Sequence, residues 1–492
     1  MEELPQSWCS VALSEIVEIN PGIDKSKFRD DEEMPFVPMP AVEAGTGRID
    51  TRERRSFGKV KSGFTPFASG DVLFAKITPC MENGKMAVVP PLPRGVGFGT
   101  TEFHVLRSTE AVDADLVYYF VSSASVRHEA QHQMTGAVGQ KRVPKRYLET
   151  KRFPLAPLNE QRRIVEKIET LFARLEKGEA ALREVQKLLA RYRQSVLKAA
   201  VTGQLTADWR AENAHRLEHG RDLLARILQT RRETWQGRGK YKEPAEPDTT
   251  DLPELPEGWV WASVEQLANV MGGLTKNKKR QEMPLRKPML RVANVYQNRL
   301  DLDDIHQTGV TENECGRVLL EELDLLVVEG NGSKDQIGRM AVWRNEIPDA
   351  VHQNHLIKVR MTEKGLVEFA LSWFQSPNGR QNIEKVASST SGLYTLSISK
   401  IEALVIPIPS LLEIAEINQL VDDTFSKIAH LEAWCETELT RSAALRQSIL
   451  KDAFAGRLVP QDPADEPASE LLARIRETRA AVPKKARRKA RA

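Results

Sequence analysis

The sequence has few cysteines, no long apolar run and almost no excess of charge of either sign. Its four cysteines lie far apart and form no Cys-x-x-Cys pair, which predicts reduced thiols and no bound metal. No apolar run approaches the roughly 18 residues of a membrane span, and the Met-Glu-Glu start is unlike a signal peptide, so we expect a cytoplasmic protein. Because 71 basic residues nearly balance 68 acidic ones, nucleic-acid binding would depend on local patches.

What the sequence does contain is an internal repeat. Residues 194–205 (QSVLKAAVTGQL) recur as residues 447–458 (QSILKDAFAGRL), with seven of twelve positions identical. The same offset of 253 residues pairs 35–42 with 288–295, and a one-residue slip pairs GKMAV at 84–88 with GRMAV at 338–342. The openings also agree, because Leu-Pro and a nearby tryptophan stand at 4–8 and again at 255–259. We therefore expect two copies of one module of about 200 residues.

Each copy begins with mixed α/β sequence. Short β-rich runs at 71–74, 86–89 and 103–106 are separated by glycine and proline clusters, and a helical stretch is expected from Asp115 to His132. Residues 257–409 repeat this texture. The pattern predicts a scaffold that carries recognition groups on its loops.

Each copy ends in a long helix. No proline occurs from Leu158 to Asp208, and apolar residues there alternate at spacings of four and three, which predicts a coiled coil that ends at Gly203. A weaker seam follows in the second copy, and two matching helices are expected to pack on each other with an approximate two-fold relation. The predicted seam residues are Ile164, Ile168, Leu171, Leu175, Leu182, Val185, Leu189, Ile417, Val421, Ile428, Leu431, Leu445 and Ile449.

These patterns predict an α+β fold class with two tandem-repeated α/β domains joined by two long antiparallel coiled-coil helices with pseudo-two-fold symmetry. A charged helical segment and proline-rich linker separates the copies, and a basic tail with Lys484, Lys485, Arg487, Arg488, Lys489 and Arg491 ends the chain. That tail fits either a flexible solubility segment or a phosphate-binding arm. The expected domains are 1–156, helix 157–206, linker 207–252, 253–409, helix 410–459 and tail 460–492.

The two modules agree in their expected strands and diverge in their loops. The loops at residues 135–143 (TGAVGQKRV) and 388–396 (SSTSGLYTL) have little sequence in common. This predicts that the two modules bind different ligands by the same method. The loops carry Lys, Arg, Gln, Asn, Ser, Thr and Tyr, which bond phosphate oxygens and base edges. The candidate DNA-contact residues are Lys59, Lys61, Lys76, Lys85, Gln140, Lys141, Arg142, Lys145, Lys276, Asn277, Lys278, Lys279, Arg280, Asn331, Ser333, Lys334, Ser389, Thr390 and Tyr394.

These motifs together resemble a known family. The chain combines a Leu-Pro-x-x-Trp opening, a variable module, a Pro-Leu-x-Glu-Gln-Arg-Arg-Ile-Val helix start at 157–165 and the duplicated helix end, and nearly all of it is repeated. This order resembles the DNA-specificity subunits of type I restriction–modification systems. The second helix start departs from the motif, since residues 411–417 read LLEIAEI.

The resemblance implies two target-recognition domains, each reading one half of an asymmetric, bipartite site in double-stranded DNA. It also implies that the long helices fix the unread spacer and dock two methyltransferase subunits. S-adenosylmethionine would be bound by those partners, and restriction subunits would use ATP and Mg for translocation and cleavage. The same architecture also serves methylation-only systems. This chain shows no Asn-Pro-Pro-Tyr, Walker A or Pro-Asp…Glu-x-Lys motif, so no catalytic residue or cofactor of its own is expected.

Two other readings remain. His128-Glu-Ala-Gln-His132 matches the HExxH pattern of zinc peptidases, although a solvated helix face is the simpler interpretation. Alternatively, the paired helices could organise a protein complex without reading DNA. Divergence confined to polar and basic loops argues against that scaffold hypothesis.

Overall fold

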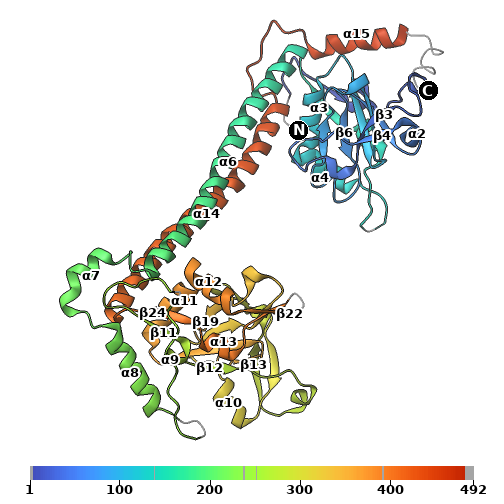
Figure 1. The fold of residues 1–492 in the computed structure, drawn as a ribbon. Helices are drawn as coiled ribbons and strands as arrows, with labels where there is room; N and C mark the ends of the chain where they lie inside the picture. Colours follow the sequence, from blue (N-terminus) through green and yellow to red (C-terminus); the bar gives the residue numbers. More distant parts are fainter. Residues whose placement is uncertain (1–3, 138, 236–238, 251, 391–392, 482–492) are drawn as a thin grey trace. The chain divides into compact units, whose positions relative to one another are not determined.

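The computed structural model describes residues 4–137, 139–235, 239–250, 252–390 and 393–481. The chain divides into two compact units: unit 1 is Met1–Arg183 with Glu436–Ala492, and unit 2 is Glu184–Cys435. The fold mixes helices and sheets as the sequence predicts (Figure 1). None of the helices in the described ranges is long and apolar enough to cross a membrane. The basic tail residues Lys484 to Arg491 lie outside the described residues.

Unit 1 is built on two four-stranded sheets and one strand pair. The first sheet has the order β2-β9-β6-β7 and the second the order β4-β3-β8-β5, in which β3 and β8 are parallel. The strands are β1 (Cys9–Ala12), β2 (Val17–Ile19), β3 (Glu33–Val37), β4 (Arg54–Ser56), β5 (Thr65–Ala68), β6 (Val72–Ala75), β7 (Met86–Val88), β8 (Val96–Gly99), β9 (Phe103–Ser108) and β10 (Arg152–Leu155). β1 pairs with β10, so the first and last strands of the module meet. The three expected strands correspond to β6, β7 and β9.

Side-chain alternation explains why β6 is apolar throughout. Val72 and Phe74 point into one hydrophobic cluster, whereas Leu73 and Ala75 point into another on the opposite face of the sheet. Because successive side chains of a strand face opposite sides, a strand covered on both sides has no solvent-facing position to fill with polar residues. The same division occurs in unit 2, where Leu326 and Leu325 enter different clusters.

Five short helices belong to the amino-terminal part of unit 1. They are α1 (Leu13–Ile16), α2 (Phe57–Val60), α3 (Ala114–Ser122), α4 (Ala124–His132) and α5 (Lys145–Thr150). The sequence predicted one helical stretch from Asp115 to His132, but the structure divides it into α3 and α4. Ser123 is extended there (φ −62°, ψ 146°), and its hydroxyl donates to the Phe120 carbonyl at 2.7 Å.

Unit 2 repeats this plan with additional strand pairs. Its four-stranded sheet β12-β21-β17-β19 corresponds to β2-β9-β6-β7, since Val72 pairs with Leu106 and Leu325 pairs with Val359, both at the 253-residue offset. The strands are β11 (Val260–Ser263), β12 (Ala268–Gly272), β13 (Arg286–Leu290), β14 (Val295–Tyr296), β15 (Arg299–Leu300), β16 (His306–Gly309), β17 (Leu325–Val328), β18 (Gly330–Asn331), β19 (Met340–Val342), β20 (Val351–His352), β21 (Leu356–Met361), β22 (Ser388–Thr390), β23 (Leu393–Thr395) and β24 (Val405–Ile408). The helices are α7 (Ala207–Asn213), α8 (Gly220–Glu233), α9 (Val264–Leu267), α10 (Glu312–Val318), α11 (Val367–Gln375), α12 (Pro377–Val386) and α13 (Ile398–Glu402).

Two helices of 44 residues each, α6 (Leu158–Val201) and α14 (Leu411–Phe454), pack together (Figure 1). In unit 1, Glu179 contacts Ser442 at 2.6 Å, and Phe172, further back in α6, lies under the Arg446 guanidinium. These contacts run in opposite chain directions, so the pair is antiparallel. In unit 2, Arg193 likewise reaches Glu432 at 3.2 Å. Gly203 follows α6 with φ +71°, the left-handed conformation that glycine adopts beyond a helix end.

The predicted seam residues differ in burial. Ile164, Ile168 and Ile449 belong to the core of unit 1, and Ile417 and Val421 belong to the core of unit 2. The remaining seam residues are buried at Leu189 and Ile428, partly buried at Leu171, Leu175 and Leu182, and exposed at Val185 (36%), Leu431 (48%) and Leu445 (47%). A two-helix pair covers only one narrow stripe of each helix, so apolar residues beside that stripe stay in contact with solvent.

Each unit is closed by a helix that follows the other repeat in sequence. Leu223 and Ile227 of α8 enter the core of unit 2, whereas Ala468 and Leu472 of α15 (Ala468–Ala481) enter the core of unit 1. These are the two copies of the repeated LLARI segment, 223–227 and 471–475. The segment expected to be a charged linker therefore contributes core residues.

A buried carboxylate anchors the Leu-Pro-x-x-Trp opening in each unit. Trp8 Nε1 donates to Glu160 at 3.0 Å, and Trp259 Nε1 donates to Glu413 at 3.0 Å. Burial raises the pKa of Glu160, although hydrogen bonds from Trp8 and Gln461 act in the opposite direction. The duplicated tryptophan and glutamate therefore fix the start of each module to the start of the long helix that follows it.

A second duplicated pair braces the sheets. Asp71 accepts hydrogen bonds from Nε and Nη2 of Arg107, both at 2.8 Å, and Asp324 accepts them from Nε and Nη2 of Arg360, both at 2.7 Å. Each aspartate also accepts a backbone N–H three residues earlier, from Ala68 and Glu321. Bidentate pairs of this kind fix geometry as well as charge.

Candidate nucleic-acid interface

Two loops of unit 1 meet where β6 ends. The Val143 N–H donates to the Lys76 carbonyl at 2.8 Å, and the Thr78 N–H donates to the Lys141 carbonyl at 3.0 Å. Ile77 also forms a β-bridge with Arg142. These backbone bonds bring together four candidates that lie far apart in sequence, namely Lys76, Gln140, Lys141 and Arg142. Lys85 lies beside them, since the Ala75 N–H donates to its carbonyl at 3.1 Å.

Unit 2 presents its corresponding loops through the same backbone pairing. Gly330 pairs with Thr395 and Ser388 pairs with Thr395 in the sheet β18-β23-β22. Adding 253 to Ile77, Arg142 and Thr135 gives these three positions, and Thr135 bridges Arg142 in unit 1. The loops that differ most in sequence are therefore held by equivalent backbone contacts. The side chains of Asn331, Ser389 and Thr390 lie outside the described part of the chain, while Tyr394 is half-buried.

Not every basic candidate in unit 1 is free to meet a ligand. Arg142 forms a bidentate pair with Glu102, with both N–O distances 2.9 Å, and this hydrogen bonding lowers the pKa of Glu102. Lys85 donates to the Met39 carbonyl at 3.2 Å. Gln140 and Lys141 are exposed. Arg142 therefore holds the loop, and the exposed neighbours are the stronger candidates for contact.

The three remaining candidates of unit 1 lie in or beside helices. Lys59 and Lys61 belong to the region of α2, beside the second sheet, and Lys61 pairs with Asp30 at 2.7 Å. Lys145 begins α5 and pairs with Glu149 at 3.0 Å. The structure does not join Lys59 and Lys61 to the loop pair by any backbone contact like that of Val143 with Lys76.

The basic run of unit 2 is separate from its paired loops. Lys276 to Lys279 are exposed beside strand β16, whereas Arg280 is held by Glu314 at 2.7 and 3.0 Å. The Arg280 guanidinium lowers the pKa of Glu314 to about 2. Ser333 and Lys334 directly follow β18, and Lys334 pairs with Glu384 at 3.1 Å. Thus Lys276, Asn277, Lys278 and Lys279 form one group, and Asn331 to Lys334 with Tyr394 form another.

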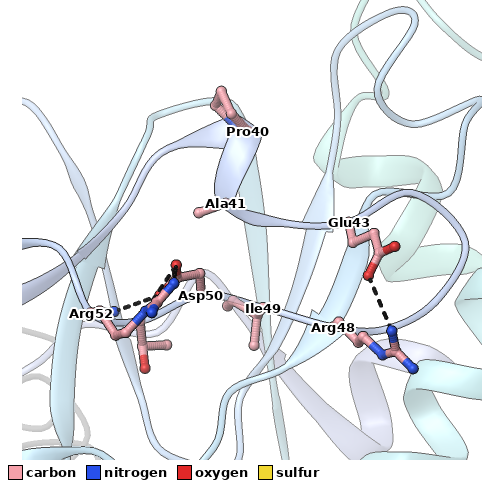
Figure 2. A pocket seen from close by; sticks show the side chains of 8 residues that line it. Pro40, Ala41, Glu43, Arg48, Ile49, Asp50 and Arg52 are labelled. Carbon is pink, nitrogen blue, oxygen red and sulfur yellow. Dashed lines mark hydrogen bonds and ion pairs between the residues drawn. The ribbon is translucent and has the colours of Figure 1, made fainter.

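The loops 39–47 and 292–297 differ between the modules in sequence, but the candidate residues include none from the hairpin tip that the structure shows there in each module. Val42 bridges Ile49 in unit 1, and β14 pairs with β15 in unit 2 through Val295 and Leu300. In unit 1 the hairpin borders an open hollow, where Arg48 pairs with Glu43 and Arg52 pairs with Asp50 (Figure 2). The Arg52 contact lowers the pKa of Asp50 to about 2. In unit 2 the tip carries Tyr296 and Arg299. The sequence did point to Arg339, which lies beside this tip. The GKMAV and GRMAV repeats align Arg339 with Lys85, which is one of the candidate residues.

The HExxH residues lie on the exposed face of α4. The Nε2 atoms of His128 and His132 are 3.2 Å apart, and Glu129 forms an ion pair with Lys151. Within the described ranges, no group of three or more His, Cys, Asp or Glu side chains is arranged to hold a metal ion. The glutamate that a zinc peptidase would use as a base is thus engaged by a lysine.

Comparison with known proteins agrees with this arrangement. Residues 5–184 match the family model described as the type I restriction modification DNA specificity domain. The chain is 30% identical over 372 residues to the EcoAI specificity subunit of Escherichia coli, covering 66% of this chain and 62% of that protein. It is 26% identical over 511 residues to the EcoKI specificity subunit of Escherichia coli strain K12, covering 99% of both chains.

A solved structure has the same fold. The crystal structure of the HsdS subunit from Thermoanaerobacter tengcongensis superimposes with a TM-score of 0.56 at 19% identity, covering 92% of this chain and 98% of that one. Each sheet module presents a pair of loops held by equivalent backbone contacts, and the loops of the two modules differ in sequence. Residues 5–184 thus match the type I restriction modification DNA specificity domain, and the chain is similar to the specificity subunits of type I restriction enzymes.

Proposed function

We propose that this chain is the sequence-specific DNA-recognition subunit of a type I restriction–modification complex, in which each module reads one half of a bipartite, asymmetric site. The observation that carries the proposal is the duplicated loop pairing, Ile77 with Arg142 and Gly330 with Thr395, which presents two dissimilar polar loops in one way. A shared framework with different loops suits the recognition of two different short base sequences, which we call the two words of the site. Phosphate contacts would position each module, and base-edge contacts would specify its word.

The proposed division of labour follows the repeat. Residues 1–156 and 253–409 are the two target-recognition domains, 157–206 and 410–459 are the spacer helices, 207–252 is the connecting segment and 460–492 is the tail. The exposed residues Gln140, Lys141 and Lys276 to Lys279 are the first choices for DNA contact, and Lys59, Lys61, Lys76 and Lys145 are second choices.

We further propose that the chain is not itself catalytic and that two methyltransferase subunits dock on the outward faces of α6 and α14. Large apolar side chains on these helices support this, since Leu188, Tyr192 and Trp434 are each about half exposed (51%, 54% and 54%). Exposed apolar groups of this size are typical of protein–protein contacts. S-adenosylmethionine would bind in the methyltransferase partner, and ATP and Mg in the restriction partner. Because the target is chromosomal and invading DNA, we place the complex in the cytoplasm.

A methylome of the host, with the gene intact and deleted, tests the proposal directly. We expect a bipartite adenine-methylation motif that disappears on deletion, because the partner flips and methylates a base only at a site that this chain recognises. Long-read sequencing gives both words and the spacer together. An unchanged methylome, together with sequence-independent DNA binding by the purified complex, would instead favour a scaffold without sequence readout.

Shortening both helices by one heptad is expected to shorten the unread spacer. Removing residues 182–188 from α6 and 433–439 from α14 takes about 10 Å from each helix at 1.5 Å per residue, which corresponds to about three base pairs of DNA at 3.4 Å each. Seven residues are close to two helical turns, so the helix segments on either side of the deletion rotate relative to each other by only about 20°. The methylome of the variant strain measures the spacer, and both words should remain the same.

The matched control removes five residues from each helix instead. At about 100° per residue, the faces then misalign by roughly 140°, and specific methylation should be lost. A heptad variant that keeps the original spacer would show that the helices do not set it.

A further inference from the structure

An exposed tyrosine at the hairpin tip of unit 2 lies between two arginines. Tyr296 ends β14, pairs with Arg299 of β15 and keeps 39% of its surface exposed. The guanidinium carbon of Arg299 lies 4.7 Å from the centre of its ring, and that of Arg339 lies 5.5 Å from it. Arg339 comes from the connection between β18 and β19, the same connection that holds Asn331 to Lys334. The cluster of Tyr296, Arg299 and Arg339 is therefore continuous with the paired loops.

Neither arginine is neutralised. Among the residues that the structure describes, no carboxylate pairs with Arg299 or Arg339, and the buried Nε of Arg339 has no hydrogen-bond partner. Two other arginines of unit 2 do pair with carboxylates: Arg360 pairs with Asp324, and Arg291 pairs with Asp304, both at 2.7 Å. A ring contact contributes about 0.5–1 kcal/mol at an exposed site and leaves the positive charge available.

The corresponding hairpin of unit 1 is built differently. Arg48 precedes Ile49 just as Arg299 precedes Leu300, so these arginines occupy equivalent places. The position of Tyr296 is taken by Glu43, which lies 4.0 Å from Arg48 (Figure 2). Glu176 lies 3.9 Å from Arg48 as well. Lys85, the counterpart of Arg339, donates to a backbone carbonyl. In unit 1 two carboxylates therefore lie beside the arginine equivalent to Arg299, whereas no described carboxylate of unit 2 pairs with Arg299 or Arg339.

We infer that Tyr296, Arg299 and Arg339 form a clamp for the DNA phosphodiester backbone that only the second module has. Guanidinium groups bind phosphate oxygens through two parallel N–H donors, and a tyrosine hydroxyl adds a donor while its ring limits the motion of both arginines. Such a contact carries no base information and holds the second module in register while its loops read the word. The inference rests on the proposed DNA-recognition function.

The salt dependence of DNA binding tests the clamp. The probe is a duplex without the target word, titrated with the complex of the full chain and its two methyltransferase subunits over a range of salt concentrations. For R299Q/R339Q, we expect the slope of log K against log salt to fall by about 1.8, because each lost phosphate contact removes about 0.9. At 0.15 M salt this corresponds to roughly 30-fold weaker binding.

Three comparisons make the outcome decisive. R299Q alone, at an exposed position, should lower the slope by about 0.9 even if the double variant folds poorly. R48Q, the equivalent change in unit 1, should leave the slope unchanged because Arg48 is already paired. A slope unchanged in both R299Q and R299Q/R339Q, or altered discrimination among second words with the slope intact, overturns the clamp. If the unaltered complex preferred no word over another, the proposed function would be wrong. The slope of log K against log salt on the duplex without the target word would still test the clamp.

Discussion

Replacing residues 253–409 with the second module of another specificity subunit is expected to change one half of the methylated motif and leave the other half intact. The junctions are Pro253 and Pro409, which flank the module on either side. The exchange carries Trp259 with it, so the donor module must keep the Leu-Pro-x-x-Trp opening that bonds Glu413. Each mismatched base pair costs about 1–3 kcal/mol. The hybrid complex should therefore prefer the original second word roughly a hundredfold less than the unaltered complex does.

The reciprocal exchange of residues 1–156 is the control, and it should change only the other word. Long-read sequencing of strains carrying each hybrid reads both words in a single experiment. If either exchange altered both words, the two modules would not read independently, and the duplicated loop pairing would not be the basis of recognition.

Replacing Glu413 with alanine is expected to destabilise unit 2 by about 3 kcal/mol, the lower end of the range for breaking a buried ion pair. Its carboxylate is 2% exposed and accepts hydrogen bonds from Trp259 Nε1 at 3.0 Å, Thr206 Oγ1 at 2.8 Å and Arg210 Nη1 at 2.6 Å. The change leaves a guanidinium that is only 20% exposed without its counter-charge. Arg210 retains one bond to the Gly203 carbonyl at 3.1 Å, which limits the loss.

Hydrogen exchange measured by mass spectrometry on the full chain locates this effect. Protection should fall in the peptides of unit 2 and remain in those of unit 1, because the two units have separate cores. Glu160→Ala is the matched control in unit 1, where the described donors are the neutral groups of Trp8 and Gln461. It should cost only about 1–2 kcal/mol. Equal losses in the two variants would show that the ion pair with Arg210 contributes nothing.

The sequence predicted those features that depend on local pattern or on the repeat. The heptad spacing indicated α6 and α14, the apolar runs indicated β6, β7 and β9, and the 253-residue offset indicated two copies of one module. Periodicity carries this information because side chains alternate with period two in strands and 3.6 in helices. The break at Ser123 was missed, since a single serine with extended backbone leaves the surrounding composition helical.

Features that depend on contacts between distant segments could not be predicted. Nothing in the run 275–280 separates Arg280, which is held by Glu314, from the exposed lysines beside it. Nor does the sequence tell that Arg142 pairs with Glu102 or that, among the described residues, the buried Nε of Arg339 has no hydrogen-bond partner. Candidate lists drawn from composition therefore mix residues that hold a loop with residues that can meet a ligand. Only the pairing pattern in three dimensions distinguishes these two groups.

The way each unit is closed has a consequence for biosynthesis. Unit 2 is one continuous stretch of chain, so a ribosome has delivered all of it before the last part of unit 1 is made. Unit 1 must wait, because Gly456 packs against Pro5, Gln461 bonds Glu160 and the Ala468 N–H donates to the Ser7 carbonyl. The module translated first is thus completed last. Until then, the apolar side chains of unit 1 that these residues cover stay exposed. A frameshift or premature stop near the 3′ end of the message would therefore prevent unit 1 from completing its fold and leave unit 2 intact.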